Sequence, residues 1–294
     1  RRFLRPVSDI EDWLPARHRK DHAIEGLPDS LVEALCAFLV GNAIRDLKGE
    51  GKTHRSMLVN VSQYTQVQDH VENLLHARLE RLQTSVRSYC GLSPDRALQD
   101  CGIRQLHEAW KREYTDCGFD WPAIQAALND AVLPVTTKAV NQRTGPRALD
   151  YDAYRDNGLR VVAVGGNSLS RGLTLYGLMV SYFRRSSAMY DTLLQMGRWF
   201  GYRTGYEDLC RVWLQRDAID WYGHISEATE ELRLDLRRMI QAKRTPKDFG
   251  LAVRAHPDSL IVTARNKMRT AGDLVRVISP SGLPFESVEL PTSV

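Results

Sequence analysis

The chain has 294 residues, of which 43% are hydrophobic and 26% are charged, and this composition is typical of a globular protein that is large enough to bury a core. The formal net charge of +4 comes from 40 basic and 36 acidic residues, an excess that permits binding to a polyanion without requiring it. No apolar run approaches the ~20 residues that span a bilayer, so we expect no membrane segment. The five cysteines are scattered and the histidines are dispersed, which gives neither a disulfide pattern nor a zinc-binding pattern. We therefore expect a cytoplasmic protein without a metal site.

Residues 1–28 mix basic residues with prolines and show no sustained period, which predicts an irregular basic lead-in or linker. The next element is a helix. Ser30 and Glu33 have the spacing of a capping box, and apolar residues from Leu31 to Leu47 recur at helical spacing until Gly49.

The sequence Gly-Glu-Gly-Lys-Thr at residues 49–53 ends like a phosphate-binding P-loop. The first glycine of that pattern is replaced by Asp46, and a predicted helix precedes the loop where a P-loop requires a strand. We therefore interpret these residues as a helix C-cap followed by a turn.

The remaining pattern alternates strands with helices, which predicts an α/β fold with a mostly parallel, RecA-like sheet flanked by helices. The predicted domains are the lead-in, a main lobe over 29–245 that carries a helical insertion at about 93–131, and a small β-containing extension over 246–294. The expected strands lie at 56–62, 132–140, 159–164, 177–183 and 209–214, and the expected helices after the first strand lie at 67–86, 187–199 and 222–239.

The loops that follow these strands share one edge of a parallel sheet, where open α/β folds bind ligands. Gly165 and Gly166 follow a strand directly, so their backbone amides are placed to bind phosphate, although a simple tight turn explains them as well. Arg198 and Arg203 flank glycines, and they either clamp phosphate or form ion pairs at a helix end.

A metal-nuclease pattern is hard to find. Pro94-Asp95 with Glu108 and Lys111 imitates one only loosely, and these residues fall in sequence predicted to be helical rather than on strands.

Three strings occur in the order of motifs IV, V and VI in the second RecA-like lobe of superfamily 2 helicases: SMLVNVS, GGNSLSRGLTL and QMGRWFGYR. Together with VTARNKM they resemble more closely the Z-one (Z1) domain family, which is labelled an endonuclease and occurs with superfamily 2 helicase modules in bacterial gene neighbourhoods of the phage-defence type. The resemblance extends from about Leu31 to Met268.

The resemblance implies that Arg198 reaches the γ-phosphate of ATP and that Arg203 assists it, although Arg203 lies two residues beyond the usual helicase spacing. Thr174 stands where many relatives carry the aspartate that touches ribose. By the same resemblance, Arg171, Gly172 and Gln195 are nucleotide-binding positions, and Ser62, Gly166, Asn167 and Ser168 are nucleic-acid-binding positions, to which Gly165 is added from its place after the strand. Asp191 is a further nucleotide-binding candidate from the residues themselves, because Asp191 and Arg171 are placed to pair with neighbouring arginines or ribose hydroxyls; surface salt bridges explain both nearly as well.

The chain has neither a P-loop nor the acidic strand motif that holds Mg²⁺. The resemblance therefore implies a fragment whose ATP and Mg²⁺ are held mainly by an upstream RecA-like lobe of the same polypeptide, with nucleic acid as the partner and DNA favoured over RNA. Two alternatives stay open: a metal-dependent endonuclease, as the family label says, and a nucleic-acid-binding module without enzymatic activity.

Overall fold

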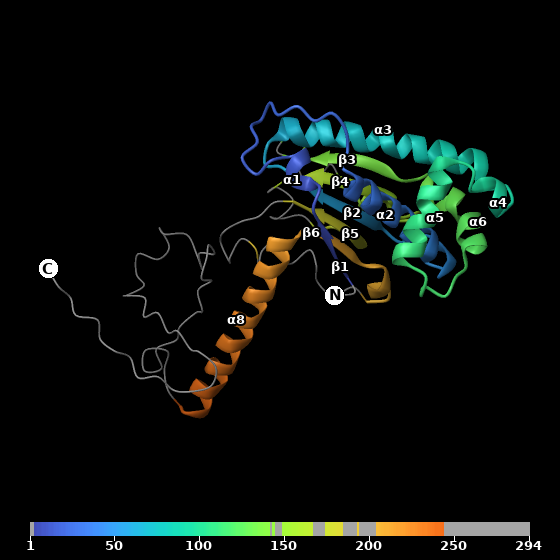
Figure 1. Ribbon diagram of the computed structural model, residues 1–294. Helices are drawn as coiled ribbons and strands as arrows, with labels where there is room; N and C mark the ends of the chain where they lie inside the picture. The colour runs from blue at the N-terminus through green and yellow to red at the C-terminus, as the bar shows by residue number, and fades with distance from the viewer. Residues whose placement is uncertain are drawn as a thin grey trace. The chain divides into compact units, whose positions relative to one another are not determined.

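The computed structural model of the chain describes residues 3–141, 143–144, 149–166, 174–184, 193 and 204–243. Six strands in these residues form one sheet in the order β1-β6-β5-β2-β4-β3, and every neighbouring pair is parallel (Figure 1). The prediction of an α/β fold is confirmed. The strands are β1 (Leu4–Val7), β2 (Arg55–Asn60), β3 (Thr136–Val140), β4 (Arg160–Gly165), β5 (Leu178–Phe183) and β6 (Arg211–Gln215).

Helices connect and cover these strands close to the predicted positions. The predicted strand at 132–140 begins only at Thr136 because Val132 still belongs to the preceding helix. The predicted helix at 187–199 lies outside the described residues except for Leu193. The described helices are α1 (Ile10–Trp13), α2 (Asp29–Leu47), α3 (Thr65–Tyr89), α4 (Pro94–Ala97), α5 (Cys101–Glu113), α6 (Trp121–Val132) and α8 (Arg216–Gln241), with single 3₁₀ turns η2 (Asp152–Tyr154) and η5 (Glu207–Leu209).

The chain divides into two compact units, of which the first comprises residues 1–186 and 194–219 and contains the sheet. The second comprises residues 187–193 and 220–294. In its described part, Leu193, Ile225 and Ala228 form a small apolar cluster. The domain boundaries predicted after residues 28 and 245 stay predictions.

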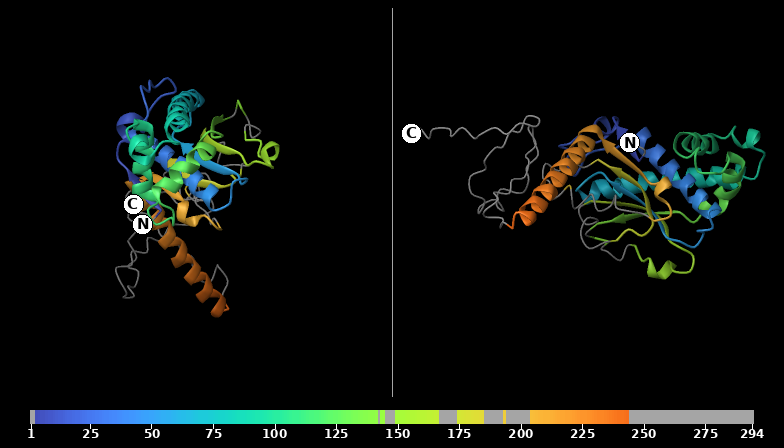
Figure 2. Two further views of the ribbon diagram at one scale, coloured as in Figure 1. Left: turned by 90° about the vertical axis from the view of Figure 1, so that its right-hand side faces the viewer. Right: turned by 90° about the horizontal axis from the view of Figure 1, so that it is seen from below.

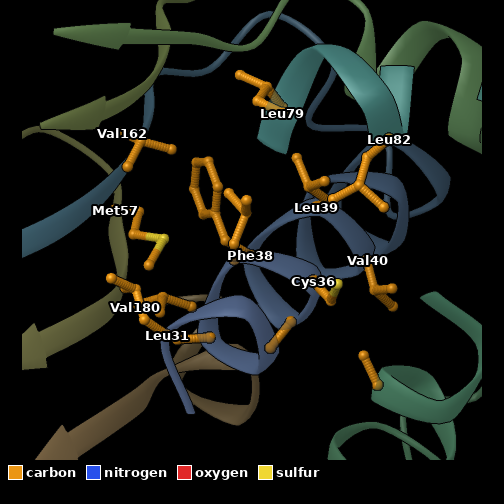
Figure 3. Packing of buried hydrophobic residues seen from close by; sticks show 14 of the residues in the cluster. Leu31, Cys36, Phe38, Leu39, Val40, Met57, Leu79, Leu82, Val162 and Val180 are labelled. Carbon is orange, nitrogen blue, oxygen red and sulfur yellow. The ribbon is translucent and has the colours of Figure 1, made fainter. Parts of the chain in front are cut away.

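The core of the first unit is built around α2, which is buried along almost its whole length. This helix packs on β2 and β5, and α3 packs on β3 and β4. Phe38 points toward Met57 and Val162 on the strands, while Leu39 faces Leu82 of α3 (Figure 3). The predicted helical insertion is indeed helical, and α5 and α6 pack directly against α2 (Figure 2).

The lead-in differs from the irregular segment that the sequence predicts, because Leu4–Val7 pairs with Val212–Gln215 of β6 as the edge strand β1. Asp9 then reaches the start of α2, where its carboxylate accepts hydrogen bonds from the Ser30 backbone N–H (2.9 Å) and the Ser30 hydroxyl (2.6 Å). The predicted capping box was therefore wrong: the helix begins one residue before Ser30, and a distant carboxylate satisfies its first turn.

A buried ion network closes the amino edge of the sheet. Asp46 at the end of α2 contacts Arg55 (2.7 Å) and Arg160 (2.9 Å), the first residues of β2 and β4. The following loop turns at Gly49, whose φ is +83°, and the Glu50 N–H donates to the Arg45 carbonyl at 2.9 Å. The interpretation of residues 49–53 as a helix end and turn is confirmed.

Gly177 immediately before β5 has no room for a side chain. Its φ is +63°, and a Cβ placed there would lie 1.7 Å from the His54 carbonyl oxygen. We expect Gly177→Ala to lower the free energy of unfolding by about 3 kcal/mol, measured by urea denaturation, because the backbone of β2 or β5 must move. Gly91→Ala is the matched control, since a Cβ added at Gly91 would meet no atom within 4 Å. Equal urea midpoints for both variants would contradict this account of Gly177.

Candidate functional site at the carboxyl edge of the sheet

A polar cavity of about 420 Å³ lies where β2, β5 and β6 end. Its walls come from the lead-in, from the loop after β2, from the residue after β5 and from the junction of β6 with α8. The described residues that line it are Glu11, Ala16, His18, Val61, Ser62, Gln63, Arg184, Gln215 and Asp217. Because parallel strands end at one edge, the fold places this cavity where ligands bind in open α/β sheets.

Ser62 joins the loop after β2 to the lead-in. Its hydroxyl lies 2.7 Å from His18 Nε2, and His18 Nδ1 lies 2.9 Å from the Pro15 carbonyl oxygen. Burial lowers the pKa of His18, and the charge of Arg184 acts in the same direction, so the ring is neutral at neutral pH. Since the Pro15 carbonyl can only accept, Nδ1 carries the proton and Nε2 accepts the Ser62 O–H.

The loops after β2 and β4 are in direct contact at Gly166. A Cβ there would lie 2.5 Å from Gln68 Nε2 and 2.8 Å from the Ser62 carbonyl oxygen, so only glycine fits. Gln68 Nε2 donates to that same carbonyl at 2.9 Å. Gly165, the last residue of β4, pairs with Val140 of β3.

Arg184 is the cation of the cavity. It follows β5 directly, its backbone N–H donates to the Asn60 carbonyl (3.0 Å), and only 7% of its surface is exposed. Its guanidinium faces Glu11 at 3.6 Å, which is too long for a hydrogen bond. In the described part of the chain, Arg184 Nε has no hydrogen-bond partner.

Asn60 is a second unsatisfied group at this edge. It is the last residue of β2 and is fully buried, and neither polar atom of its side-chain amide has a partner in the described structure. Buried amides are normally hydrogen-bonded because an unmade bond costs free energy.

The structure thus brings together three of the residues predicted for the site, namely Ser62, Gly165 and Gly166. Ser62 is buried and hydrogen-bonded inside the chain, and its contact with nucleic acid stays a prediction. The other predicted residues lie outside the described residues: Asn167, Ser168, Arg171, Gly172, Asp191, Gln195, Arg198 and Arg203.

The sequence analysis did not identify Arg184 or His18 as site residues. The sequence could have placed Arg184 at the carboxyl edge, because this residue directly follows a buried strand. No sequence pattern places His18 and Glu11 there, since their position depends on the lead-in folding back beside β6.

The described residues contain no group of three or more His, Cys, Asp or Glu side chains that could hold a metal ion. The nuclease-like positions lie in helices, with Asp95 in α4 and an exposed Glu108–Lys111 pair (3.5 Å) in α5. Among the described helices, none has the length and apolar character needed to cross a membrane.

A family model described as the Z1 domain matches residues 30–260, which span most of the chain. The chain belongs to the Z1 domain family. The match begins with α2 and includes the five strands from β2 to β6, so the Z1 domain contains nearly all of the sheet. No curated protein and no solved structure matched the chain.

Proposed function

We propose that this Z1 domain is the C-terminal lobe of a nucleic-acid-dependent ATPase of the superfamily 2 helicase type, in which Arg198 and Arg203 act on ATP held by an upstream RecA-like lobe. Bacterial DNA processing or phage defence is the setting that the family resemblance suggests. ATP with Mg²⁺ would supply the phosphoryl group for hydrolysis.

The observation that carries this proposal is the contact between two motif loops at the carboxyl edge. The segment after β2 resembles helicase motif IV, and the segment that begins at Gly165 and Gly166 resembles motif V. Gly166 packs on Ser62 with no space for a Cβ, so the two loops start from one place on the sheet, as ligand-binding loops of an α/β lobe do.

The chain's own residues would act by position and charge. A planar guanidinium binds phosphate oxygens through two parallel hydrogen bonds and stabilises negative charge that develops during phosphoryl transfer. The unpartnered amide of Asn60 lies at the end of the same strand from which the Ser62 loop leaves.

The test is ATP hydrolysis by the native polypeptide that contains this chain, measured with and without added DNA or RNA. We expect hydrolysis to rise on addition of nucleic acid, and more strongly with DNA. Cleavage of plasmid by Mg²⁺ or Mn²⁺ without ATP would favour the endonuclease instead. Salt-dependent binding that nucleotide leaves unchanged would favour the non-enzymatic module.

A further inference from the structure

The carboxyl-edge cavity contains a cation whose bonding is incomplete. Arg184 presents five N–H donors, yet its side chain meets one carboxylate at 3.6 Å, and the buried Nε has no partner in the described structure. Arg184 is only 7% exposed, and burying a guanidinium whose N–H groups lack acceptors costs free energy. A ligand that accepts those hydrogen bonds would remove this cost.

The start of α3 follows the loop that lines this cavity, and it is a second feature that attracts anions. Ser62 and Gln63 line the cavity, and α3 begins two residues later and runs for 25 residues. Within the described residues, its N-cap position, Tyr64, makes no side-chain hydrogen bond to the first turn. A long uncapped helix leaves backbone N–H groups and a partial positive charge at this end.

We propose that this cavity binds a phosphate group, held by the Arg184 guanidinium and the N-terminal end of α3, and that the Glu11 carboxylate occupies part of the site until phosphate displaces it. Glu11 is suited to this role because it is the one carboxylate facing Arg184 among the described ion pairs, and its side chain is 50% exposed. Fork-shaped guanidinium groups and helix N-termini are both matched to phosphate oxygens.

Asp217 also lines the cavity, although Glu11 is the carboxylate that faces the Arg184 guanidinium among the described ion pairs. Because two acidic side chains in the cavity disfavour an anion, we expect the affinity for free phosphate to be weak. The cavity volume of about 420 Å³ leaves room for more than a phosphate group. The phosphate is thus either a free phosphate group or part of a nucleic-acid strand, and the second source rests on the proposed function.

The experiment is calorimetric titration of the full chain, without ATP, with inorganic phosphate and separately with a short single-stranded DNA. We expect Arg184→Gln to weaken binding about ten-fold or more, since hydrogen bonds to a charged group are lost. Glu11→Gln is expected to strengthen binding roughly three-fold, because a competing charge is removed. Arg155→Gln, at a side chain that is 79% exposed, is the control and should leave binding unchanged.

If Arg184→Gln weakens and Glu11→Gln strengthens the binding of inorganic phosphate, the site binds a free phosphate group. If the two variants change the binding of DNA in this way but not that of inorganic phosphate, the site binds a phosphate of a nucleic-acid strand. Equal binding by all four proteins, or no binding by any, overturns the proposal. Glu11→Gln carries the test even if Arg184→Gln disturbs folding. Because ATP is absent, the result with inorganic phosphate is independent of whether the proposed ATPase function holds.

Discussion

Arg198→Ala in the native polypeptide is expected to reduce nucleic-acid-stimulated ATP hydrolysis about 1,000-fold, the scale by which an arginine that contacts the transferred phosphoryl group accelerates the reaction. The proposed role places the guanidinium on the γ-phosphate, so its loss removes charge stabilisation from the transition state. The measurement is the steady-state rate of phosphate release at saturating nucleic acid. Binding of ATP by the upstream lobe should change far less.

Arg155→Ala is the matched control for this prediction. Its guanidinium is highly exposed, and among the described ion pairs its partner is Asp152 at 2.9 Å, three residues away. We expect its hydrolysis rate to equal that of the unchanged protein. If Arg198→Ala also keeps the full rate while folding normally, the assignment of Arg198 is wrong.

Glu113→Gln is expected to lower the free energy of unfolding by about 3 kcal/mol, because it leaves two guanidinium groups without their shared anion. The Glu113 side chain is completely buried at the end of α5 and contacts Arg211 of β6 (2.8 Å) and Arg5 of β1. The network therefore ties the edge of the sheet to α5. Chemical denaturation of the whole chain measures the effect.

Glu108→Gln on the same helix is the matched control, since that side chain is 62% exposed. We expect it to shift the free energy of unfolding by less than about 0.5 kcal/mol. Equal losses for the two variants would show that the buried network does not stabilise the fold.

The same network predicts a pH dependence. Burial by itself raises the pKa of Glu113, but the hydrogen bonds and charges of Arg5 and Arg211 outweigh it and hold the pKa below its ordinary value. A depressed carboxyl pKa stabilises the folded state above the pKa of the unfolded chain, and this contribution is lost as pH falls through the folded value. The difference between the wild type and Glu113→Gln should therefore shrink below about pH 4.

The elements that the sequence predicts well are those whose pattern is local. The helices α2, α3 and α8 and the strands β2, β4 and β5 follow from apolar spacing within each segment. The N-cap of α6 is local as well, because the Asp120 side chain accepts from the Ala123 N–H at 3.1 Å, three residues away.

The features that the sequence could not predict depend on contacts between distant segments. β1 exists because Leu4–Val7 meets Val212–Gln215, more than 200 residues later. The carboxylate at the start of α2 comes from Asp9, and the His18–Ser62 hydrogen bond spans 44 positions. The hydrophobic period of a single segment carries no information about its contacts with distant segments. The cavity wall that residues of the lead-in form could therefore be found only from the structure.

The most direct test of the central claim is a structure of the native polypeptide with a non-hydrolysable ATP analogue and Mg²⁺. The account predicts the analogue bound to an upstream lobe, with the Arg198 guanidinium within hydrogen-bonding distance of its γ-phosphate. A bound analogue with Arg198 buried in internal ion pairs and turned away from the nucleotide would contradict the account.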